Sequence, residues 1–560
     1  MRRAEALVLL IAGLAVLAPS VGLAINHSNG TYVWSGAYGP VPGDAAQYLI
    51  WIRDASHHVF VGDLFSLDRV SRTFLHPGVL ASSLLARIGV SPPLAFMAAI
   101  FTGVVVLCLG ARSYVRATVA EGWGRPLALA AGLLFVSLML DIVPNGGSWL
   151  LIKLSYNSPT NVMSGYPYAA ISIGLVFFAI AHFIALRSRN ATWSPMLCGI
   201  LLVAAWLQPW QGVCASGTLL ATEALLVTGR FRGLAGGGRR GLRGASLGIT
   251  GALACAPPLV YLFLLQRLDP AFKAMVTHTG ILLGDQRWWM ILIVFAPLLV
   301  PAVAIVLVPV RSLADLVLRV LPAVTLSAAM LINYTKIAQS PDHALRGFPI
   351  AMAVPAVVAL THLMKGVSIP VRAFSLAAWL AIVGVVSLSQ QVVTNFLDSV
   401  DPARDGVRAP YIQRDDRAAL DLLASPELPQ GGVVASTDLA RSVPWTTGRQ
   451  AWYGHDAWTP NAAARRQAVE AIGFGTMSDS RLLLGMGSGR FAAATGARYF
   501  LIGCKWSEVT NVQQVAAQAE WIRRLGCATL IKLRPTSASD RAYVDWIYGP
   551  RSLRSLKLLN

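Results

Sequence analysis

Long apolar runs dominate the first 390 or so residues of the chain. Eleven of these runs reach, or come close to, the roughly 20 residues that a helix needs to cross the hydrocarbon core of a bilayer. They cover approximately residues 5–25, 93–113, 126–144, 168–187, 195–210, 211–229, 245–265, 288–310, 313–333, 347–364 and 373–392. We therefore predict a polytopic α-helical membrane protein with about eleven transmembrane helices. A cleaved signal peptide is the alternative for the first run, which Arg2 and Arg3 precede.

The charged residues between the runs indicate the direction of the helices. If the N-terminus is cytoplasmic, every inner connection is short and basic, as the positive-inside rule requires. The inner residues are Arg2, Arg3, Arg112, Arg116, Arg125, Arg187, Arg189, Arg230, Arg232, Arg239, Arg240, Arg243, Arg311, Lys365 and Arg372. The outer connections are longer and contain Asp44, Asp54, Asp63, Asp68, Asp269, Asp285 and Asp342. An odd number of spans then places the C-terminal segment outside the cytoplasm.

The composition changes after about residue 392. Charges of both signs, Pro/Gly turns and short alternating apolar segments predict a C-terminal extracytoplasmic α/β domain over 393–560, following a transmembrane domain over 1–392. We expect strands at 432–436, 497–503 and 529–533 and an amphipathic helix at 511–525. In an exported domain Cys504 and Cys527 can form a disulfide, or they can remain two buried thiols.

Overall composition agrees with a membrane protein: 55% of the 560 residues are hydrophobic and only 13% are charged. The net charge of +19 raises the question of nucleic-acid binding. The basic residues lie mostly in short clusters between apolar runs, so we interpret them as topology signals and expect no nucleic-acid partner. No motif of an ATPase, zinc protease or serine hydrolase occurs in a plausible context.

Candidate chemistry begins in the first outer loop, residues 26–92. A Pro-Gly turn precedes a helical segment in which Asp44 occupies the start, with Tyr48 and Trp51 following on one face. A carboxylate there can cap free backbone N–H groups, or it can act in a site. His76-Pro77 then precedes an amphipathic segment ending near Arg87, which we expect to lie along the outer interface.

Together these segments resemble the GT-C superfamily of polyprenyl-phosphate-dependent glycosyltransferases. The resemblance rests on Gly43-Asp44, Gln47-Tyr48-Leu49, His76-Pro77 and the Leu-Ala-Arg-Ile-Gly-Val-Ser-Pro segment before the second span, and covers about 120 residues. Related members include protein O-mannosyltransferases, lipid A aminoarabinose transferases and mycobacterial-type arabinofuranosyl- and mannosyltransferases. Ala45 and Gly78 depart from the family pattern, in which a second acidic residue and a second proline stand at these positions. In the tail, Ser442 to His455 is similar to a Pro-x-x-Thr-Gly-Arg-x-x-x-x-Gly-His stretch of such membrane proteins.

The resemblance implies a polyprenyl-phosphate-linked sugar as donor, an envelope glycan or lipid as acceptor, and membrane lipids as the surroundings. It implies that Asp44 is the general base of an inverting transfer. The remaining implied substrate-binding residues are Tyr48, Asp54, His76, Lys153, His343 and Arg346. A divalent metal is left open but not favoured, because the second acidic residue is missing.

Several basic residues could hold the donor phosphate near the outer surface. They are Arg69, Arg72, His76, Lys153, His278, Arg287, His343 and Arg346. We favour His343 and Arg346, which directly precede a span, although snorkelling at the interface would place them there too. Asp54 is either a second acidic group or the partner of a base. His455 and Asp456 either recognise the acceptor or cap turns.

Two further features are open to a functional or a structural interpretation. The loop Asn157–Asn161, with Tyr166 and Tyr168, could bind sugar or anchor the chain at the interface. Glu223 lies well inside a span and could take part in function or pair with an inner arginine.

Two other function classes compete with a glycosyltransferase. A transporter or flippase for an envelope precursor would explain the helices, but few charges lie inside the spans and no repeated halves are visible. A non-catalytic envelope-assembly protein with a binding module as its tail is the third reading.

Overall fold

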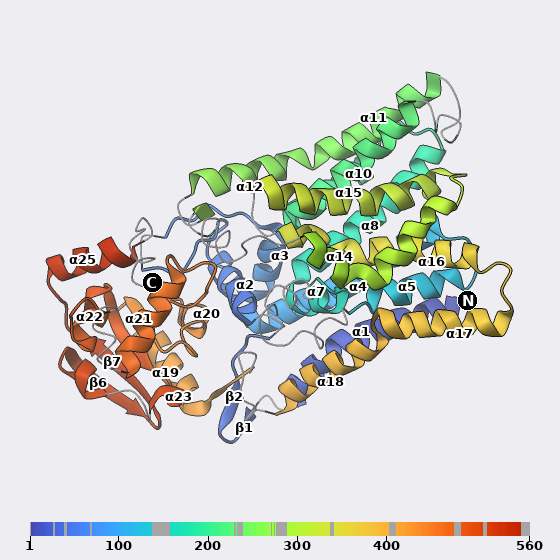
Figure 1. Ribbon diagram of the computed structural model, residues 1–560. Helices are drawn as coiled ribbons and strands as arrows, with labels where there is room; N and C mark the ends of the chain where they lie inside the picture. The colour runs from blue at the N-terminus through green and yellow to red at the C-terminus, as the bar shows by residue number, and fades with distance from the viewer. Residues whose placement is uncertain are drawn as a thin grey trace. The chain divides into compact units, whose positions relative to one another are not determined.

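A computed structural model of the chain divides into two compact units (Figure 1). The helical unit comprises Met1–Val21, Met97–Leu264 and Leu283–Leu397, and the mixed unit comprises Gly22–Phe96, Leu265–Leu282 and Asp398–Asn560. The structure describes residues 2–25, 28–38, 42–67, 70–136, 157–228, 231, 234, 239–269, 272–273, 275, 288–335, 341–401, 410–474, 483–507 and 512–549.

Packed apolar helices make up the helical unit. Four helices contribute residues to both units: α1 (Arg2–Ile25), α4 (Pro92–Thr118), α12 (Ala256–Leu268) and α18 (Val386–Val400). The others are α5 (Gly124–Leu133), α7 (Pro159–Gly165), α8 (Pro167–Ser188), α9 (Pro195–Leu207), α10 (Pro209–Val227), α11 (Arg239–Ala254), α14 (Trp288–Val303), α15 (Leu313–Thr335), α16 (Phe348–Leu363) and α17 (Ile369–Leu380). Short 3-10 or π turns are η3 (Ala304–Leu307), η4 (Pro341–Gly347) and η5 (Ala381–Val385).

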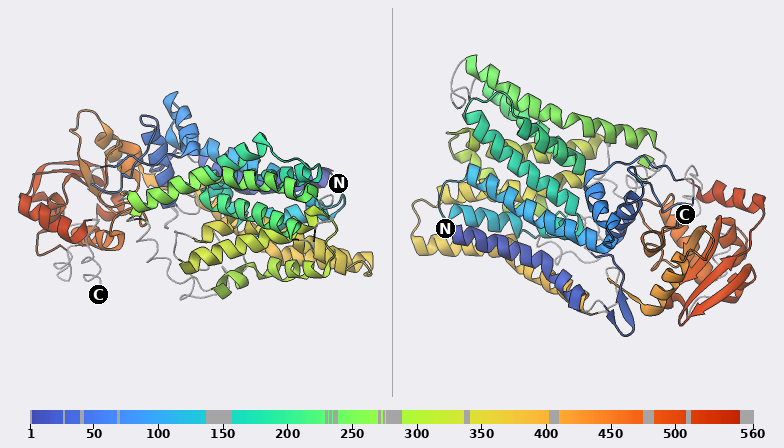
Figure 2. Two further views of the ribbon diagram at one scale, coloured as in Figure 1. Left: turned by 90° about the horizontal axis from the view of Figure 1, so that it is seen from above. Right: turned by 180° about the vertical axis from the view of Figure 1, so that it is seen from behind.

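Helix α16 lies at the centre of the helical unit, against α5 and α14 (Figures 1 and 2). The rings of Phe135, Phe295 and Phe348 pack there, with centroids 5.6 Å apart for the first pair and 5.1 Å for the second. All three side chains are buried. A core of this kind holds the helices in fixed positions, because close-packed interiors tolerate little sliding.

Six helices in the described part of the chain are long and apolar enough to cross a membrane. They are Arg2–Leu23, Pro92–Thr118, Pro167–Ser188, Ala245–Leu268, Leu313–Ile332 and Asp342–Leu363. Shorter apolar helices occupy Pro195–Leu207, Ile291–Leu307 and Ile369–Gly384. The chain is thus a helical protein of membrane type, while the number of eleven spans stays a prediction. Part of the expected span 126–144 lies outside the described residues.

A carboxylate and an arginine pair inside the helical unit. Arg187 Nε donates to Glu223 Oε1 at 3.0 Å, and both side chains are almost completely buried. Gly248 makes room for this pair, because a Cβ there would lie 2.4 Å from Glu223 Cγ. The expected pairing of Glu223 with an arginine is confirmed, and removing either partner would leave a buried charge uncompensated.

Two small sheets organise the mixed unit. In the first, β1 (Ser28–Asn29), β2 (Tyr32–Trp34) and β3 (Tyr411–Gln413) pair in antiparallel order. The second has the order β4-β5-β7-β6, with β4 (Gly432–Ala435) parallel to β5 (Ala497–Ile502) and the remaining pairs antiparallel. Figure 2 shows this second sheet in the orange-red part of the chain.

The strands expected at 432–436, 497–503 and 529–533 are confirmed as β4, β5 and β7 (Ala528–Leu533). The helix expected at 511–525 is wrong. Only α24 (Val512–Ala516) is helical, and β6 (Ala519–Leu525) forms a hairpin with β7. The hairpin is favoured because Gly526, at φ +58°, closes the turn and six of the seven residues of β6 pair with β7.

The mixed unit contains helices as well as the two sheets. The helices of the mixed unit are α2 (Pro42–Ala55), α3 (Pro77–Arg87), α19 (Arg414–Ala424), α20 (Ser442–Thr447), α21 (Ala462–Phe474), α22 (Ser488–Ala494), α23 (Cys504–Ser507), α24 and α25 (Ala538–Tyr548). The first loop, residues 26–92, therefore shares a compact unit with the tail. The division of the sequence into domains at residue 392 stays a prediction.

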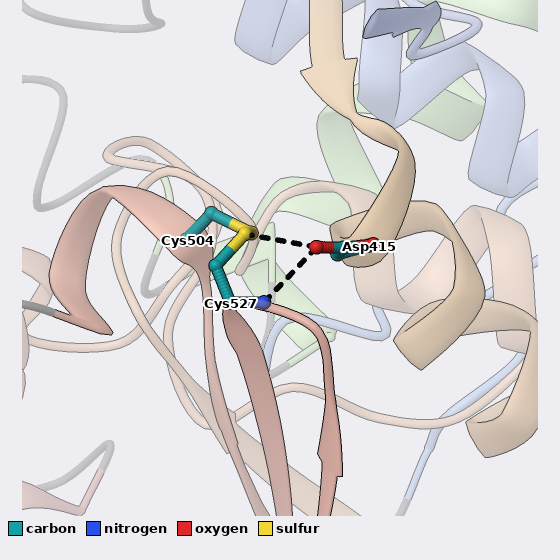
Figure 3. Close-up of side chains that lie close together, drawn as sticks. All are labelled: Asp415, Cys504 and Cys527. Atoms are coloured by element: carbon teal, nitrogen blue, oxygen red, sulfur yellow. Dashed lines mark hydrogen bonds between the residues drawn. A yellow bond between two sulfur atoms is a disulfide. The ribbon is translucent and has the colours of Figure 1, made fainter. Parts of the chain in front are cut away.

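A disulfide joins Cys504, just after β5, to Cys527 in the β6–β7 turn (Figure 3). Asp415 at the start of α19 accepts a hydrogen bond from Cys527 N at 3.0 Å. A Cβ at residue 526 would lie 1.9 Å from Asp415 Oδ2, so this approach requires glycine. Of the two alternatives for Cys504 and Cys527, the structure has the disulfide.

Beside this disulfide, Asp416 is a buried carboxyl group. Its Oδ1 accepts a hydrogen bond from Cys504 N at 2.8 Å. Burial raises the pKa of Asp416 to about 7; the hydrogen bond from Cys504 lowers it by less, and the nearby Asp438 raises it further. Since the folded-state pKa exceeds the usual value, the protonated form stabilises this unit at low pH, and that stabilisation is lost as the pH rises through about 7.

We predict that Asp416→Asn makes the mixed unit less sensitive to pH between about 4 and 7. The wild-type unit should lose up to about 1.4 kcal/mol of stability per pH unit in this range, because the carboxyl group ionises in the unfolded state while the buried one stays protonated. Pulse proteolysis in urea on the detergent-solubilised protein measures the difference. Asp421→Asn, an exposed carboxylate on the same helix, is the control. Equal pH dependence of wild type and Asp416→Asn would contradict the prediction.

Candidate functional site

Helix α2 carries the residue that the sequence marks as the candidate base. The helix begins at Pro42, whose fixed φ suits a first helical position, and Asp44 lies in its first turn. Carboxylates are favoured there because the free N–H groups and the helix dipole are positive at this end. The Asp44 side chain is 32% exposed, so it remains accessible to a substrate.

His455 from the tail contacts Asp44. The two atoms His455 Nε2 and Asp44 Oδ1 are 3.1 Å apart, although 411 residues separate them in sequence. The His455 side chain is only 7% exposed, and its ring packs against Phe65 with centroids 5.7 Å apart. The mixed unit therefore presents a partly exposed carboxylate paired with a buried imidazole.

Hydrogen bonds to the other ring nitrogen determine the tautomer of His455. Its Nδ1 lies 3.0 Å from Ala457 N and 3.4 Å from Trp458 N, and both backbone groups donate to it. An Nδ1 that accepts carries no proton, so in the neutral ring the proton is on Nε2 and points to Asp44. Thr459 Oγ1 accepts from Gly454 N and His455 N, which fixes the turn.

Four aromatic rings form a closed cycle in the mixed unit. Trp51 contacts Phe74 and Trp458, and Phe272 contacts the same two rings, with centroid distances between 4.9 and 5.2 Å. Three of the rings come from α2, the loop before α3 and the turn that holds His455. Phe272 comes from the Leu265–Leu282 segment, where Asp269 accepts from Thr73 Oγ1 at 2.6 Å and from Phe272 N at 3.1 Å.

Two other residues of α2 differ in their surroundings. Tyr48 stacks on Phe96 at 5.6 Å and meets Trp51 edge-on, so its ring packs in the aromatic surroundings of α2. Gln47, one turn after Asp44, is 2% exposed, and neither amide atom has a hydrogen-bond partner among the described residues. The sequence had marked Tyr48 as substrate-binding, and that role stays a prediction.

Asp54 at the end of α2 is held by several donors. Its carboxylate accepts from Arg72 Nε at 3.1 Å and Gly62 N at 3.1 Å, and His58 Nδ1 lies 3.2 Å away. The Asp54 side chain is 5% exposed. Of the two interpretations of Asp54, the geometry agrees with a carboxylate that pairs with a basic residue. These contacts tie residues 62 and 72 to α2.

His76 begins α3. Its Nδ1 accepts from Val79 N at 3.2 Å, and Pro77 follows at the first helical position. The expected amphipathic segment after Pro77 is confirmed as a helix, Pro77–Arg87. The geometry gives His76 a capping role, and a contact with substrate stays a prediction.

His343 and Arg346 both belong to η4 in the helical unit. The backbone carbonyl of His343 accepts from Gln211 Nε2 at 3.1 Å. The Arg346 guanidinium lies 3.9 Å from the centroid of the Tyr166 ring and is 4% exposed. Asp342 is buried on the same turn, yet no ion pair joins Arg346 to any carboxylate in the described part of the chain.

Polar residues are also buried near the start of α7 in the same unit, which contacts η4. Ser158 caps α7 through Asn161 N, and every residue of α7 is buried. Asn157 is fully buried, and neither of its amide atoms has a partner among the described residues. Four of the basic candidates, Arg69, Lys153, His278 and Arg287, lie outside the described residues.

The tail motif divides into a structural part and a part at the site. Arg449 donates to the carbonyls of Leu423, Leu428 and Pro429 at 2.7 to 2.9 Å, and Gly448 takes the left-handed conformation. His455, at the end of the motif, is the residue that contacts Asp44. Sequence reasoning left His455 out of the main site, although the Gly-His end of the motif was a signal for it.

One group in the described residues has the residue types of a metal site. It comprises Asp415, Cys504 and Cys527. The two sulfurs are bonded to each other, so they offer no thiolates and the group does not fit a metal ion. Whether a metal takes part near Asp44 stays a prediction.

Comparison with known proteins places the fold. No family model matches this sequence, and no curated protein matches it. The crystal structure of the Archaeoglobus fulgidus oligosaccharyltransferase in the apo form matches with a TM-score of 0.51 at 12% identity, over 90% of this chain and 70% of that chain. The archaeal oligosaccharyltransferase AglB from the same organism, in complex with an inhibitory peptide and a dolichol-phosphate, has a TM-score of 0.43 at 13% identity, over 92% and 72% of the two chains. The apo-form match shows that this chain has a fold like that of the oligosaccharyltransferase.

We predict that Asp54→Asn and Arg72→Gln each destabilise the mixed unit, and that their effects are not additive. Removing the carboxylate weakens the bonds to Arg72 and Gly62, which we expect to cost about 1–3 kcal/mol. Pulse proteolysis in urea of the two single variants and the double variant measures the coupling. Additive losses would mean that the two side chains do not act as a pair.

Proposed function

We propose that this protein is a membrane glycosyltransferase of the GT-C kind. It transfers a sugar from a polyprenyl-phosphate donor to an envelope glycan or lipid acceptor. Two features support the proposal: the fold resembles that of an oligosaccharyltransferase, and the first loop resembles GT-C transferases at Asp44 and His76-Pro77. From the distribution of arginines between the apolar runs we also propose that the N-terminus is cytoplasmic and the C-terminal region is extracytoplasmic.

The reaction is a single displacement at the anomeric carbon. The acceptor hydroxyl oxygen forms the new bond to that carbon, and the bond between the carbon and the phosphate oxygen breaks. Polyprenyl phosphate leaves with the bonding electrons, and the configuration is inverted. Asp44 takes the hydroxyl proton as general base, which a carboxylate can do when it lies within hydrogen-bond reach of the acceptor.

The observation that carries the proposal is the state of Asp44. Its side chain is one-third exposed at the start of a helix, while a buried histidine fixes one of its oxygens. A purely structural carboxylate in this unit looks different, as Asp54 does with its 5% exposure and several donors. Asp44 is thus both held in place and accessible, as a general base must be.

In the helical unit, Arg346 serves as the ligand of the donor phosphate. No carboxylate among the described residues pairs with its buried guanidinium, and Tyr166 covers one of its faces. A buried cation is costly unless an anion joins it. A phosphate matches the fork of N–H donors that arginine offers. His343 on the same turn and Asn157 near α7 are further candidates for contacts with the donor.

Removing the base tests the reaction itself. We predict that Asp44→Asn lowers kcat of sugar transfer by at least about 100-fold, because general base catalysis typically contributes 10²–10⁴-fold. The assay follows radiolabelled polyprenyl-phosphate sugar into envelope acceptors with the purified protein in detergent, with Asp421→Asn as control. Full activity of Asp44→Asn would refute the assigned role. Movement of the labelled lipid across vesicles without transfer would favour a flippase instead.

Replacing the phosphate ligand should act on donor binding. We expect Arg346→Gln to raise KM for the lipid-phosphate donor about 10-fold or more, and Arg346→Lys to retain part of the affinity, because lysine keeps the charge but not the planar fork. The exposed Arg311→Gln in the same unit is the matched control. An unchanged donor KM in Arg346→Gln would exclude this residue as the phosphate ligand.

A further inference from the structure

His455 joins the tail to the carboxylate at the start of α2. From this geometry we infer that His455 is a positioning residue, which orients Asp44 and favours its ionised form. The tail then completes the catalytic centre in addition to any role in binding the acceptor. The inference rests on the proposed role of Asp44 as general base.

The hydrogen bond between His455 and Asp44 has a defined direction. Two backbone N–H groups, of Ala457 and Trp458, donate to His455 Nδ1. The neutral ring must therefore carry its proton on Nε2 and donate it to Asp44 Oδ1 over 3.1 Å. A donor of this kind stabilises the carboxylate more than the carboxylic acid.

Neighbouring groups hold the His455 imidazole in a fixed orientation. Thr459 bonds to the backbone at both Gly454 and His455, Thr459 N donates to His455 O, and the Phe65 ring covers the imidazole. Residue 43 lies directly beside the imidazole, because a Cβ there would be in van der Waals contact with His455 Cδ2 at 3.4 Å. A ring held from several sides can fix a carboxylate within the narrow geometry that proton transfer needs.

Two arginines near α2 bind backbone carbonyl groups. Arg53 Nη1 donates to the carbonyls of Trp445 and Thr446, in α20. Arg87, from α3, donates to the carbonyls of Ala55 and Ser56.

The remaining titratable groups on these elements are also engaged. Asp54 binds Arg72, His76 Nδ1 accepts from Val79 N, and the Asp456 carboxylate accepts from Tyr453 Oη. Helix α20 itself contains no titratable side chain. The contact with His455 is the one through which we expect the C-terminal region to act on Asp44.

Two substitutions separate positioning from support of the turn. An asparagine amide can replace Nδ1 and accept from Ala457 and Trp458, but it cannot reach Asp44. A glutamine amide can replace Nε2 and donate to Asp44, but it leaves the two backbone groups without their acceptor. If His455 positions Asp44, His455→Asn should reduce catalysis more than His455→Gln. If His455 only supports the turn, His455→Gln should reduce it more.

We expect His455→Asn to lower kcat about 10- to 100-fold, the size typical of a lost hydrogen bond to a charged group, with KM for the donor unchanged. The acidic limb of its pH–rate profile should move to higher pH, because Asp44 loses a donor that favours its ionised form. His455→Gln should recover part of kcat and return the limb toward its wild-type position. Thermal unfolding of all variants in detergent checks that they fold.

A double variant tests whether the two residues act through one another. His455→Asn should have little further effect when Asp44 is already Asn, because there is no base left to position. If His455→Asn retains wild-type kcat and pH profile while Asp44→Asn is inactive, the inference fails and the proposed function stands. If Asp44→Asn is fully active, the proposed role of Asp44 fails first.

Discussion

The mixed unit depends on closing distant segments of the chain onto one another. Strands β2 and β3 pair with each other although Tyr32–Trp34 and Tyr411–Gln413 lie far apart in the sequence. The cycle of Trp51, Phe74, Phe272 and Trp458 adds large apolar rings from all three segments. Loop-closure entropy rises only slowly with length, so a few buried aromatic contacts can offset it. Asp44 and His455 meet because this closure holds their segments together.

Buried arginines in this protein have different partners. Arg449 and Arg465 are buried arginines that each bind backbone carbonyls, and so they stabilise loops. Arg346 in the helical unit is buried as well, and its guanidinium lies over the Tyr166 ring. Burial alone therefore does not distinguish these arginines; the groups that they contact do.

Local patterns in the sequence predicted local structure well. The apolar runs and three strands of the tail were visible because run length and alternation are properties of neighbouring residues. Residues 519–525 have a helix-like pattern, but they form a strand because they pair with β7. This pairing depends on tertiary packing, which the local sequence pattern does not contain. The contact between Asp44 and His455 could not be read from one sequence, since no periodicity links residues 411 apart. Asp44 itself was found through a motif.

The separation of Asp44 and His455 along the sequence also sets a delay between their synthesis on the ribosome. A ribosome adding about 5–20 residues per second needs about 20–80 s to pass from one to the other. During that interval Trp51 and Phe74 have emerged, but Trp458 has not been made. The first loop must therefore wait, exposed or chaperoned, until the last fifth of the chain arrives. A chain cut short after the final apolar helix would contain all the predicted transmembrane helices but would lack His455.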